Sequence, residues 1–156
     1  MHDMLVRLYA LPPLAPVLDA CARDGVAIRR ALAPERSAVL AFVGHHFASS
    51  VGEVETAFAS TPVRCVVAVR ASALLGFACH DVTCRNFFGP EGVAESERGR
   101  GIGRALLLAT LHAQRAAGYG YAIIGGVGPA AFYRRTVDAV DIADSTPGIY
   151  AGMLHR

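Results

Sequence analysis

The sequence contains little that would build a metal site or a disulfide framework. Its only cysteines are Cys21, Cys65, Cys79 and Cys84; no two of them form a C-x-x-C pair, and no histidine stands at the spacing of a zinc site. We therefore expect no metal, and we interpret the cysteines as reduced thiols that are mostly buried.

An excess of charge of one sign is also missing. Fifteen basic side chains stand against thirteen acidic ones, which gives a formal net charge of +2, and charged residues make up only 18% of the chain. This balance excludes a general nucleic-acid binder, whose surface needs a clear excess of positive charge. Hydrophobic residues make up 53%, which excludes a disordered polar tail and predicts one globular domain with a buried core.

No apolar run in the sequence is suited to a membrane. Residues 116–133 carry no charge, but five glycines and Pro129 among them argue against a spanning helix. The first seven residues contain Asp3 and Arg7 within their apolar stretch, unlike a secretory signal. We expect a cytoplasmic protein without a membrane segment.

What the sequence does contain is a glycine- and arginine-rich segment, residues 97–104, in front of a long helical pattern. Three glycines alternate with other residues there. Because glycine has no Cβ, the backbone N–H groups of such a segment can approach a phosphate closely. Apolar residues then recur at helical spacing over residues 102–116, so the segment ends at a helix N-terminus that favours negative charge. The pattern predicts a diphosphate-binding loop.

Two common phosphate-binding motifs do not fit this loop. A P-loop needs a Lys-Ser/Thr pair after its last glycine, whereas Gly103 is followed by Arg104 and Ala105. A dinucleotide fingerprint needs G-x-G-x-x-G and an acid that ends a strand further on, and the chain has neither. What remains is R-x-x-G-x-G, formed by Arg98, Gly101 and Gly103, which resembles the pyrophosphate loop of the GNAT (GCN5-related) superfamily of N-acetyltransferases.

A second segment makes this resemblance more specific. After the predicted helix and its natural C-cap Gly118, a buried strand at residues 121–124 is followed by the pair Phe132-Tyr133. GNAT proteins place such an aromatic-tyrosine pair on a short helix at this distance after the loop, behind a strand that splays from its neighbour. The resemblance covers about residues 26–154.

The resemblance implies a single-domain α/β fold with a mixed, twisted sheet flanked by helices. The N-acetyltransferase domain is expected at residues 26–156, with a strand-helix extension at residues 1–25 that packs on it. The implied function is transfer of an acetyl group from acetyl-CoA, as co-substrate, to a primary amine by direct attack on the thioester. The acceptor, a small-molecule or peptide amine, is left open, and so is the oligomeric state, although GNAT proteins often form homodimers. A non-catalytic acyl-CoA-binding module and a structural domain whose loop binds nothing are the alternatives.

The sequence also predicts where the strands and helices lie. Strands are expected at residues 4–11, 26–31, 63–70, 74–81, 83–95, 121–124, 138–143 and 148–154. Helices are expected at residues 13–23, 34–47, 50–60 and 102–116 and around the Phe132-Tyr133 pair.

The resemblance assigns roles to individual residues as well. Cofactor binding is expected from Val93, Ala94, Glu95, Arg98, Gly99, Arg100, Gly101, Ile102, Gly103 and Arg104. Backbone amides near Val93 and Glu95 are expected to pair with the pantetheine arm and to polarise the thioester carbonyl. Tyr133 stands where the family keeps its general acid, a group that can protonate the leaving thiolate.

The general base is left among several groups. We rank Glu91 first, because GNAT proteins commonly carry an apolar residue at about this position and a carboxylate there can take a proton from an ammonium group. Glu95, His46 and ordered water are the other candidates, and both glutamates are equally well explained as surface carboxylates. The acceptor pocket is expected to include His46, Phe88 and Tyr150, although core packing explains the two aromatic residues equally well.

Overall fold

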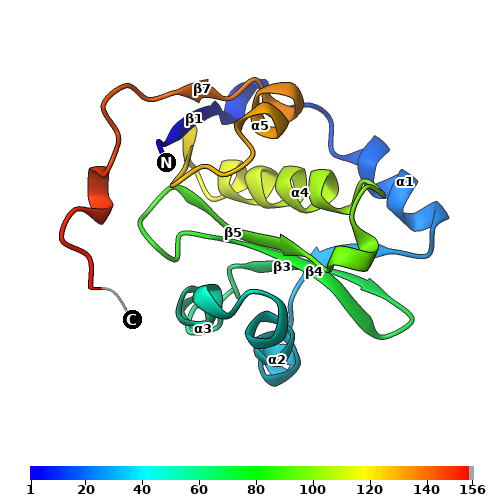
Figure 1. The fold of residues 1–156 in the computed structure, drawn as a ribbon. Helices are drawn as coiled ribbons and strands as arrows, with labels where there is room; N and C mark the ends of the chain where they lie inside the picture. The colour runs from blue at the N-terminus through cyan, green and yellow to red at the C-terminus, as the bar shows by residue number, and fades with distance from the viewer. Residues whose placement is uncertain (155–156) are drawn as a thin grey trace.

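The chain folds into three layers, with one seven-stranded mixed sheet between two layers of helices (Figure 1). The computed structural model describes residues 1–154. Helices α1, α4 and α5 lie on one face of the sheet, and helices α2 and α3 lie on the other. This architecture confirms the predicted α/β class.

Strands and helices follow one another along the chain largely in the predicted order. The strands are β1 (Met4–Arg7), β2 (Ala27–Arg30), β3 (Cys65–Arg70), β4 (Ala73–His80), β5 (Phe87–Val93), β6 (Tyr121–Ile124) and β7 (Val140–Asp141). The helices are α1 (Ala15–Arg23), α2 (Arg36–His46), α3 (Val51–Phe58), α4 (Ile102–Ala116) and α5 (Ala130–Val137). Gly118 follows α4 with a φ of 103°, as its predicted role at the end of that helix requires.

The C-terminal part of the chain departs from the prediction. Residues 148–154 do not form a strand; they form a 3-10 helix at Gly148–Tyr150 followed by turns, so the predicted strand is wrong. Gly148 and Gly152 have φ angles of 55° and 74°, which interrupt an extended backbone. The other predicted C-terminal strand is present as β7, but it is only two residues long.

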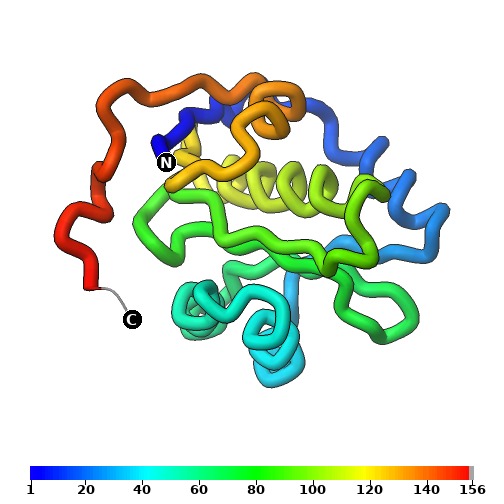
Figure 2. The backbone as a smooth tube through the Cα atoms, in the orientation of Figure 1, coloured from blue at the N-terminus to red at the C-terminus, as the bar shows by residue number. Residues whose placement is uncertain are grey.

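The first strand of the chain lies inside the sheet. The strand order is β2-β3-β4-β5-β6-β1-β7, so β1 pairs antiparallel with β6 on one side and with β7 on the other. Met4 faces Ile124 in the β6 pairing and is fully buried in the same core as Leu106 of α4. Figure 2 shows the blue N-terminal strand beside the orange segment that carries β7. Residues 1–25 thus contribute a strand and a helix to the common sheet and core.

Each face of the sheet has its own hydrophobic core. On one face, Leu106 and Leu111 of α4 are completely buried. On the other face, Val43 of α2 and Val54 of α3 pack with Phe77 of β4, and all three are completely buried. Full burial of a side chain of this size contributes about 1.5–3 kcal/mol. The two cores therefore fix both layers of helices on the sheet.

Gly92 of β5 makes room for an aromatic ring that follows α2. A Cβ at Gly92 would lie only 2.6 Å from the ring of Phe47. The same ring lies 5.7 Å from the ring of Phe77, measured between centroids, in an edge-to-face arrangement. Phe47 is therefore fixed against the α2 side of β5.

We expect Gly92→Ala to destabilise the fold, because the new methyl group overlaps the Phe47 ring and forces it to move. The expected loss in the free energy of unfolding is about 1–3 kcal/mol. Gly120→Ala is the matched control, because a Cβ at Gly120 would meet no heavy atom within 4 Å. Urea denaturation of both variants measures the effect, and equal stability of Gly92→Ala and the wild-type protein would contradict this packing.

Candidate active site

The glycine-rich loop leads directly into the first turn of α4. Gly99 and Gly101 have φ angles of 76° and 81°, and a Cβ at either position would point into open space. Gly101 occupies the N-cap position, and a hydrogen bond of 3.1 Å runs from Ala105 N to Gly101 O. The amides of residues 102–104 precede this bond, so they have no acceptor within the helix and are available to an anion.

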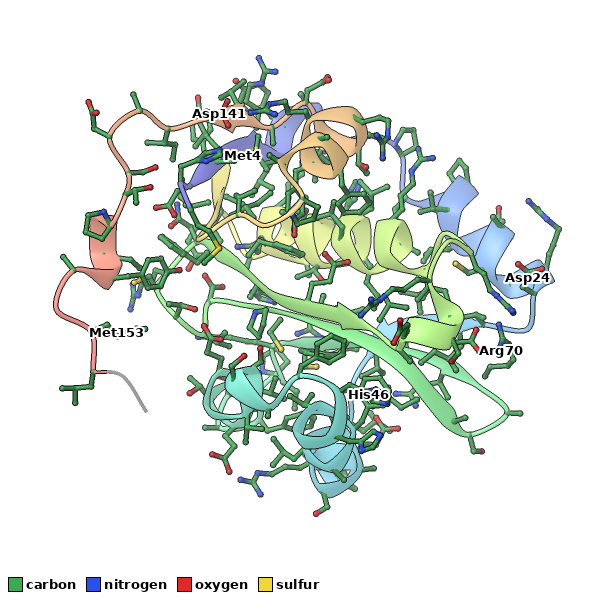
Figure 3. The ribbon with its side chains drawn as sticks, viewed as in Figure 1. Met4, Asp24, His46, Arg70, Asp141 and Met153 are labelled. Carbon is green, nitrogen blue, oxygen red and sulfur yellow. The ribbon has the colours of Figure 1, made fainter. Side chains whose placement is uncertain are left out.

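Arginine side chains hold this loop in place. Arg98 Nε donates a hydrogen bond of 3.1 Å to Val93 O, which ties the loop to the end of β5. Glu97 accepts a hydrogen bond of 3.0 Å from Arg70 Nη1 and lies 3.8 Å from Arg100 Nη1. Arg70, labelled in Figure 3, belongs to β3, and no motif in the sequence connects it with the loop. The sequence analysis therefore missed this contact.

The glycine-rich loop follows β5, a strand that separates from its neighbour β6 before it ends. β5 and β6 pair in parallel over only two residue pairs, Phe87 with Ile123 and Phe88 with Ile124. β6 ends at Ile124, whereas β5 continues to Val93. The far half of β5 therefore has no neighbouring strand on this side, which is the splayed arrangement that the resemblance implies.

The open edge of β5 presents the backbone of Val93. The next residue, Ala94, donates its N–H to Leu75 O on the other side of the strand at 2.9 Å. Successive residues of a strand direct their backbone polar groups to opposite edges, so the N–H of Val93 faces the open edge. Of the amides predicted to bind the cofactor, that of Ala94 is thus engaged within the sheet. Glu95 is exposed at the start of a 3-10 turn.

A cavity of about 260 Å³ opens between the diverging strands. Its walls are residues 88–91 of β5, residues 124–129 at and after the end of β6, and Tyr133 of α5. The glycine-rich stretch 125–128 was not predicted to belong to the site. A run of small residues directly after a buried strand could have indicated it, because such residues leave the backbone open to a ligand.

Tyr133 contributes a largely buried side chain to this cavity. The residue is only 8% exposed, and its ring packs edge-to-face with Phe88 and Phe132 at centroid distances of 6.3 Å and 5.2 Å. Burial raises the pKa of Tyr133, and the negative charge of Glu91 raises it further. Tyr133 therefore keeps its proton near neutral pH, as a general acid must.

Glu91 lies on β5 opposite Ala78 of β4 and reaches toward the start of α4. A Cβ placed on Gly103 would be 3.6 Å from Glu91 Oε1. Within residues 1–154, this buried oxygen has no hydrogen-bond partner. Burial raises the pKa of Glu91 to about 8, so the carboxyl group is largely protonated at pH 7.

The structure brings some of the predicted residues together and separates others. Glu91, Phe88 and Tyr133 line one cavity. His46 is exposed at the end of α2, on the opposite face of the sheet, and its ring lies 4.6 Å from that of Phe42 (Figure 3). Tyr150 packs over Gly125, where an added Cβ would lie 2.5 Å from its hydroxyl oxygen.

The sequence analysis did not single out a buried polar pair at the end of β4. His80 Nδ1 lies 2.8 Å from Asp81 Oδ2, and both side chains are almost completely buried. Asp81 Oδ1 also accepts a hydrogen bond of 2.6 Å from Asn86 N, which closes the turn into β5. Burial lowers the pKa of His80, so the imidazole is neutral at pH 7. This pair does not line the cavity and serves to shape the turn.

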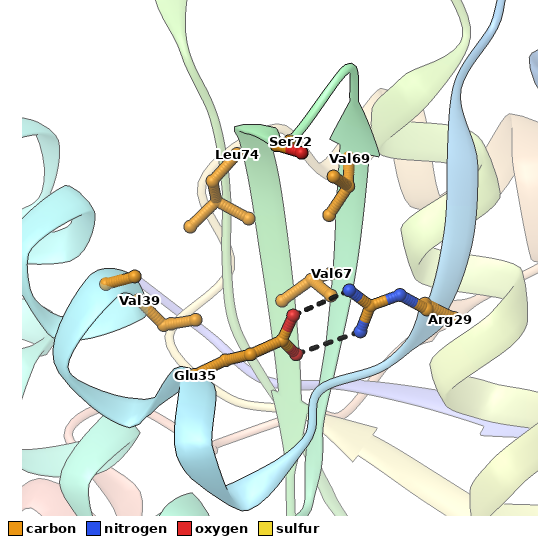
Figure 4. Close-up of a pocket in the computed structure, with 8 residues that line it drawn as sticks. Arg29, Glu35, Val39, Val67, Val69, Ser72 and Leu74 are labelled. Atoms are coloured by element: carbon orange, nitrogen blue, oxygen red, sulfur yellow. Dashed lines mark hydrogen bonds and ion pairs between the residues drawn. The ribbon is translucent and has the colours of Figure 1, made fainter.

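A second hollow, of about 230 Å³, lies between α2 and strands β2–β4 (Figure 4). Arg29 Nη1 and Nη2 donate to the two carboxylate oxygens of Glu35 at 2.9 Å and 2.6 Å at one end of it. Val67, Val69 and Leu74 form the apolar floor. The Arg29 guanidinium lowers the pKa of Glu35 to about 2. None of the residues predicted to be functional lines this hollow.

Over residues 1–154, no helix is long and apolar enough to cross a membrane. The same residues contain no group of three or more His, Cys, Asp or Glu side chains that could hold a metal ion.

Comparison with known proteins finds similarity in structure but not in sequence. No family model and no curated protein matches the chain. The GCN5-related glucosamine N-acetyltransferase region of a fungal multi-domain GH3 β-N-acetylglucosaminidase matches 90% of the chain with a TM-score of 0.75 and 15% identity. A GCN5-related N-acetyltransferase from Sphaerobacter thermophilus matches 90% of it with a TM-score of 0.64 and 19% identity.

The chain spans 19% of the first of these proteins and 48% of the second. It therefore corresponds to one part of each. The similarity shows that the chain has the fold of the GCN5-related N-acetyltransferases, which confirms the predicted resemblance at the level of the fold.

We expect Gly101→Val to abolish acetyl-CoA binding, because a branched side chain is strained at a φ of 81° and its methyl groups would enter the space before α4. Gly118→Val is the matched control. Gly118 has a φ of 103° and equally open surroundings, but it lies at the other end of α4. Calorimetric titration of both folded variants measures binding, and wild-type affinity in Gly101→Val would remove the loop from the site.

Proposed function

We propose that the chain is an acyltransferase that takes an acetyl group from acetyl-CoA and passes it to a primary amine. The observation that carries this proposal is the cavity between β5 and β6, which Tyr133 lines and whose Glu91 lies beside Gly103 at the glycine-rich start of α4. The similarity in fold to GCN5-related N-acetyltransferases supports it.

The residues around the cavity suit coenzyme A in both charge and shape. The amides of residues 102–104 would hold the diphosphate, since they lack acceptors within the helix. The exposed side chains of Arg100 and Arg104 add positive charge at the same place. Along the open edge of β5, the N–H of Val93 would donate a hydrogen bond to an amide or thioester carbonyl oxygen. Bound acetyl-CoA supplies the activated acyl group.

The proton chemistry rests on the side chains of the cavity. Tyr133 holds a proton on its hydroxyl group. The leaving thiolate has a thiol-like pKa of about 8.5, so a hydrogen bond from this hydroxyl or partial transfer of its proton is enough for it to leave. The acceptor amine must be neutral when it attacks. The group that removes its proton stays a prediction, with ionised Glu91, Glu95, His46 and water as the candidates.

Turnover with a panel of amines tests the proposal. The purified protein is incubated with acetyl-CoA and single acceptors: an amino sugar, a polyamine, an amino acid, an aminoglycoside and a peptide with a free N-terminus. Glucosamine is included because a protein of the same fold carries a glucosamine N-acetyltransferase region. Mass spectrometry of the acetylated amine and of free coenzyme A records the reaction. Acetyl-CoA binding without turnover of any amine would favour the non-catalytic alternative.

We expect Tyr133→Phe to lower kcat by about ten- to a hundredfold, because the ring still packs but the proton donor is lost. Acetyl-CoA affinity should stay close to that of the wild-type protein. Tyr121→Phe is the control, since Tyr121 is 46% exposed and does not line the cavity. Equal kcat values for Tyr133→Phe and wild type would show that Tyr133 only packs.

A further inference from the structure

Within residues 1–154, the carboxyl group of Glu91 has no compensating charge. Its Oε1 is buried and has no hydrogen-bond partner within residues 1–154. The carboxyl group lies beside Gly103, in the first turn of α4, and lines the cavity between β5 and β6. A buried polar oxygen without a hydrogen-bond partner destabilises the fold, because its lost hydration is not replaced. A proton on the carboxyl group or a bound ligand would reduce this cost.

Within residues 1–154, no side chain packed around Glu91 offers a positive charge. On β4 its neighbour is Ala78, and residues 124–129 on the opposite wall carry no charge. On α5, Tyr133 is the only other titratable side chain that lines the cavity. The nearby arginines are directed elsewhere, since Arg98 Nε donates to Val93 O and Arg104 of α4 is exposed.

We propose that Glu91 is held in its neutral form and that the cavity binds acyl-CoA only in this form, so that ligand binding is linked to a proton on Glu91. This inference rests on the function proposed above. It assigns Glu91 the role of a hydrogen-bond donor toward a carbonyl oxygen of the ligand's amide-rich arm. It also removes a negative charge from the helix end that would hold the diphosphate.

Repulsion between an ionised Glu91 and a bound diphosphate favours the neutral form. An ionised carboxylate beside the first turn of α4 would repel the diphosphate and would itself occupy the favourable field of the helix N-terminus. A neutral carboxylic acid causes no such repulsion and carries an O–H donor, as buried acids do in some oxyanion sites. Because burial raises the pKa of Glu91 to about 8, most molecules already carry this proton at pH 7. A bound anion raises that pKa further.

The donor role and the base role that the sequence predicts require opposite protonation states. A base must be ionised, so its contribution grows as the pH rises through about 8. A donor must be neutral, so its contribution is complete well below pH 8 and is lost above it. The pH dependence of ligand binding therefore separates the two roles without a rate measurement.

The test is calorimetric titration with acetyl-CoA between pH 7 and pH 9, in buffers with different ionisation enthalpies. Acetyl-CoA is used because its sulfur carries no titrating proton. The expected Kd is about tenfold higher at pH 9 than at pH 7, as the neutral fraction of Glu91 falls. Binding at pH 9 should take up close to one proton from the buffer.

Two variants complete the experiment. Glu91→Gln stays neutral and should bind with a Kd that changes little with pH, which also corrects for titration of the ligand itself. Glu55→Gln, at an exposed glutamate of α3 on the other face of the sheet, should keep the wild-type pH dependence. If Glu91→Gln does not fold, the carboxyl carbon of Glu91, followed by carbon NMR in wild-type protein with and without acetyl-CoA, provides the same readout.

The possible results divide clearly. A wild-type Kd that is constant with pH, without proton uptake, overturns the role of Glu91 and leaves the proposed function intact. A Kd that improves above pH 8 also overturns it and favours an ionised Glu91. Failure to bind acetyl-CoA at every pH overturns the inference together with the proposed function.

Discussion

The short parallel pairing of β5 with β6 is the constraint on which the site depends. A strand in a sheet satisfies its backbone groups through both neighbours, and β5 loses one neighbour after Phe88. The unpaired edge must then meet solvent or a ligand. Because β5 runs on toward α4 and β6 turns away into α5, the same separation creates the cavity and places Glu91 and Tyr133 on its walls. The loop before α4 follows the end of β5, and Gly103 in the first turn of α4 lies beside Glu91.

Burial, more than ion pairing, keeps the two walls in position. The α4 side and the α2 side of the sheet each have a core of completely buried apolar residues. The ion pairs around the loop are partly exposed; in the Arg70–Glu97 pair the side chains are 30% and 16% exposed. Pairs of this kind contribute about 0–1 kcal/mol each. Their role is directional: they hold the loop against β3 and β5.

Local patterns in the sequence were enough to predict the central elements and the loop. Gly101 and Gly118 bracket α4 as the glycine pattern indicates, and the Phe132-Tyr133 pair lies on a short helix after β6. The features that were missed depend on residues far apart in the chain. Neither the contact of Arg70 with Glu97 nor the burial of the Glu91 carboxyl group leaves a periodic signal. The failed strand at residues 148–154 has a local cause, since its glycines adopt positive φ angles that the apolar pattern does not reveal.

The internal position of β1 has a consequence for how the protein folds. Met4 pairs with Ile124, so β1 finds this partner only after the residues between them have been synthesised. Contacts between residues this far apart slow folding, because a large loop must close before they form. Until β1 pairs with β6, one edge of β6 is unpaired. Residues 125–129, which follow β6 and line the cavity, are then not held in position. The cavity is thus among the last parts of the molecule to form, even though the glycine-rich loop and α4 are local structures.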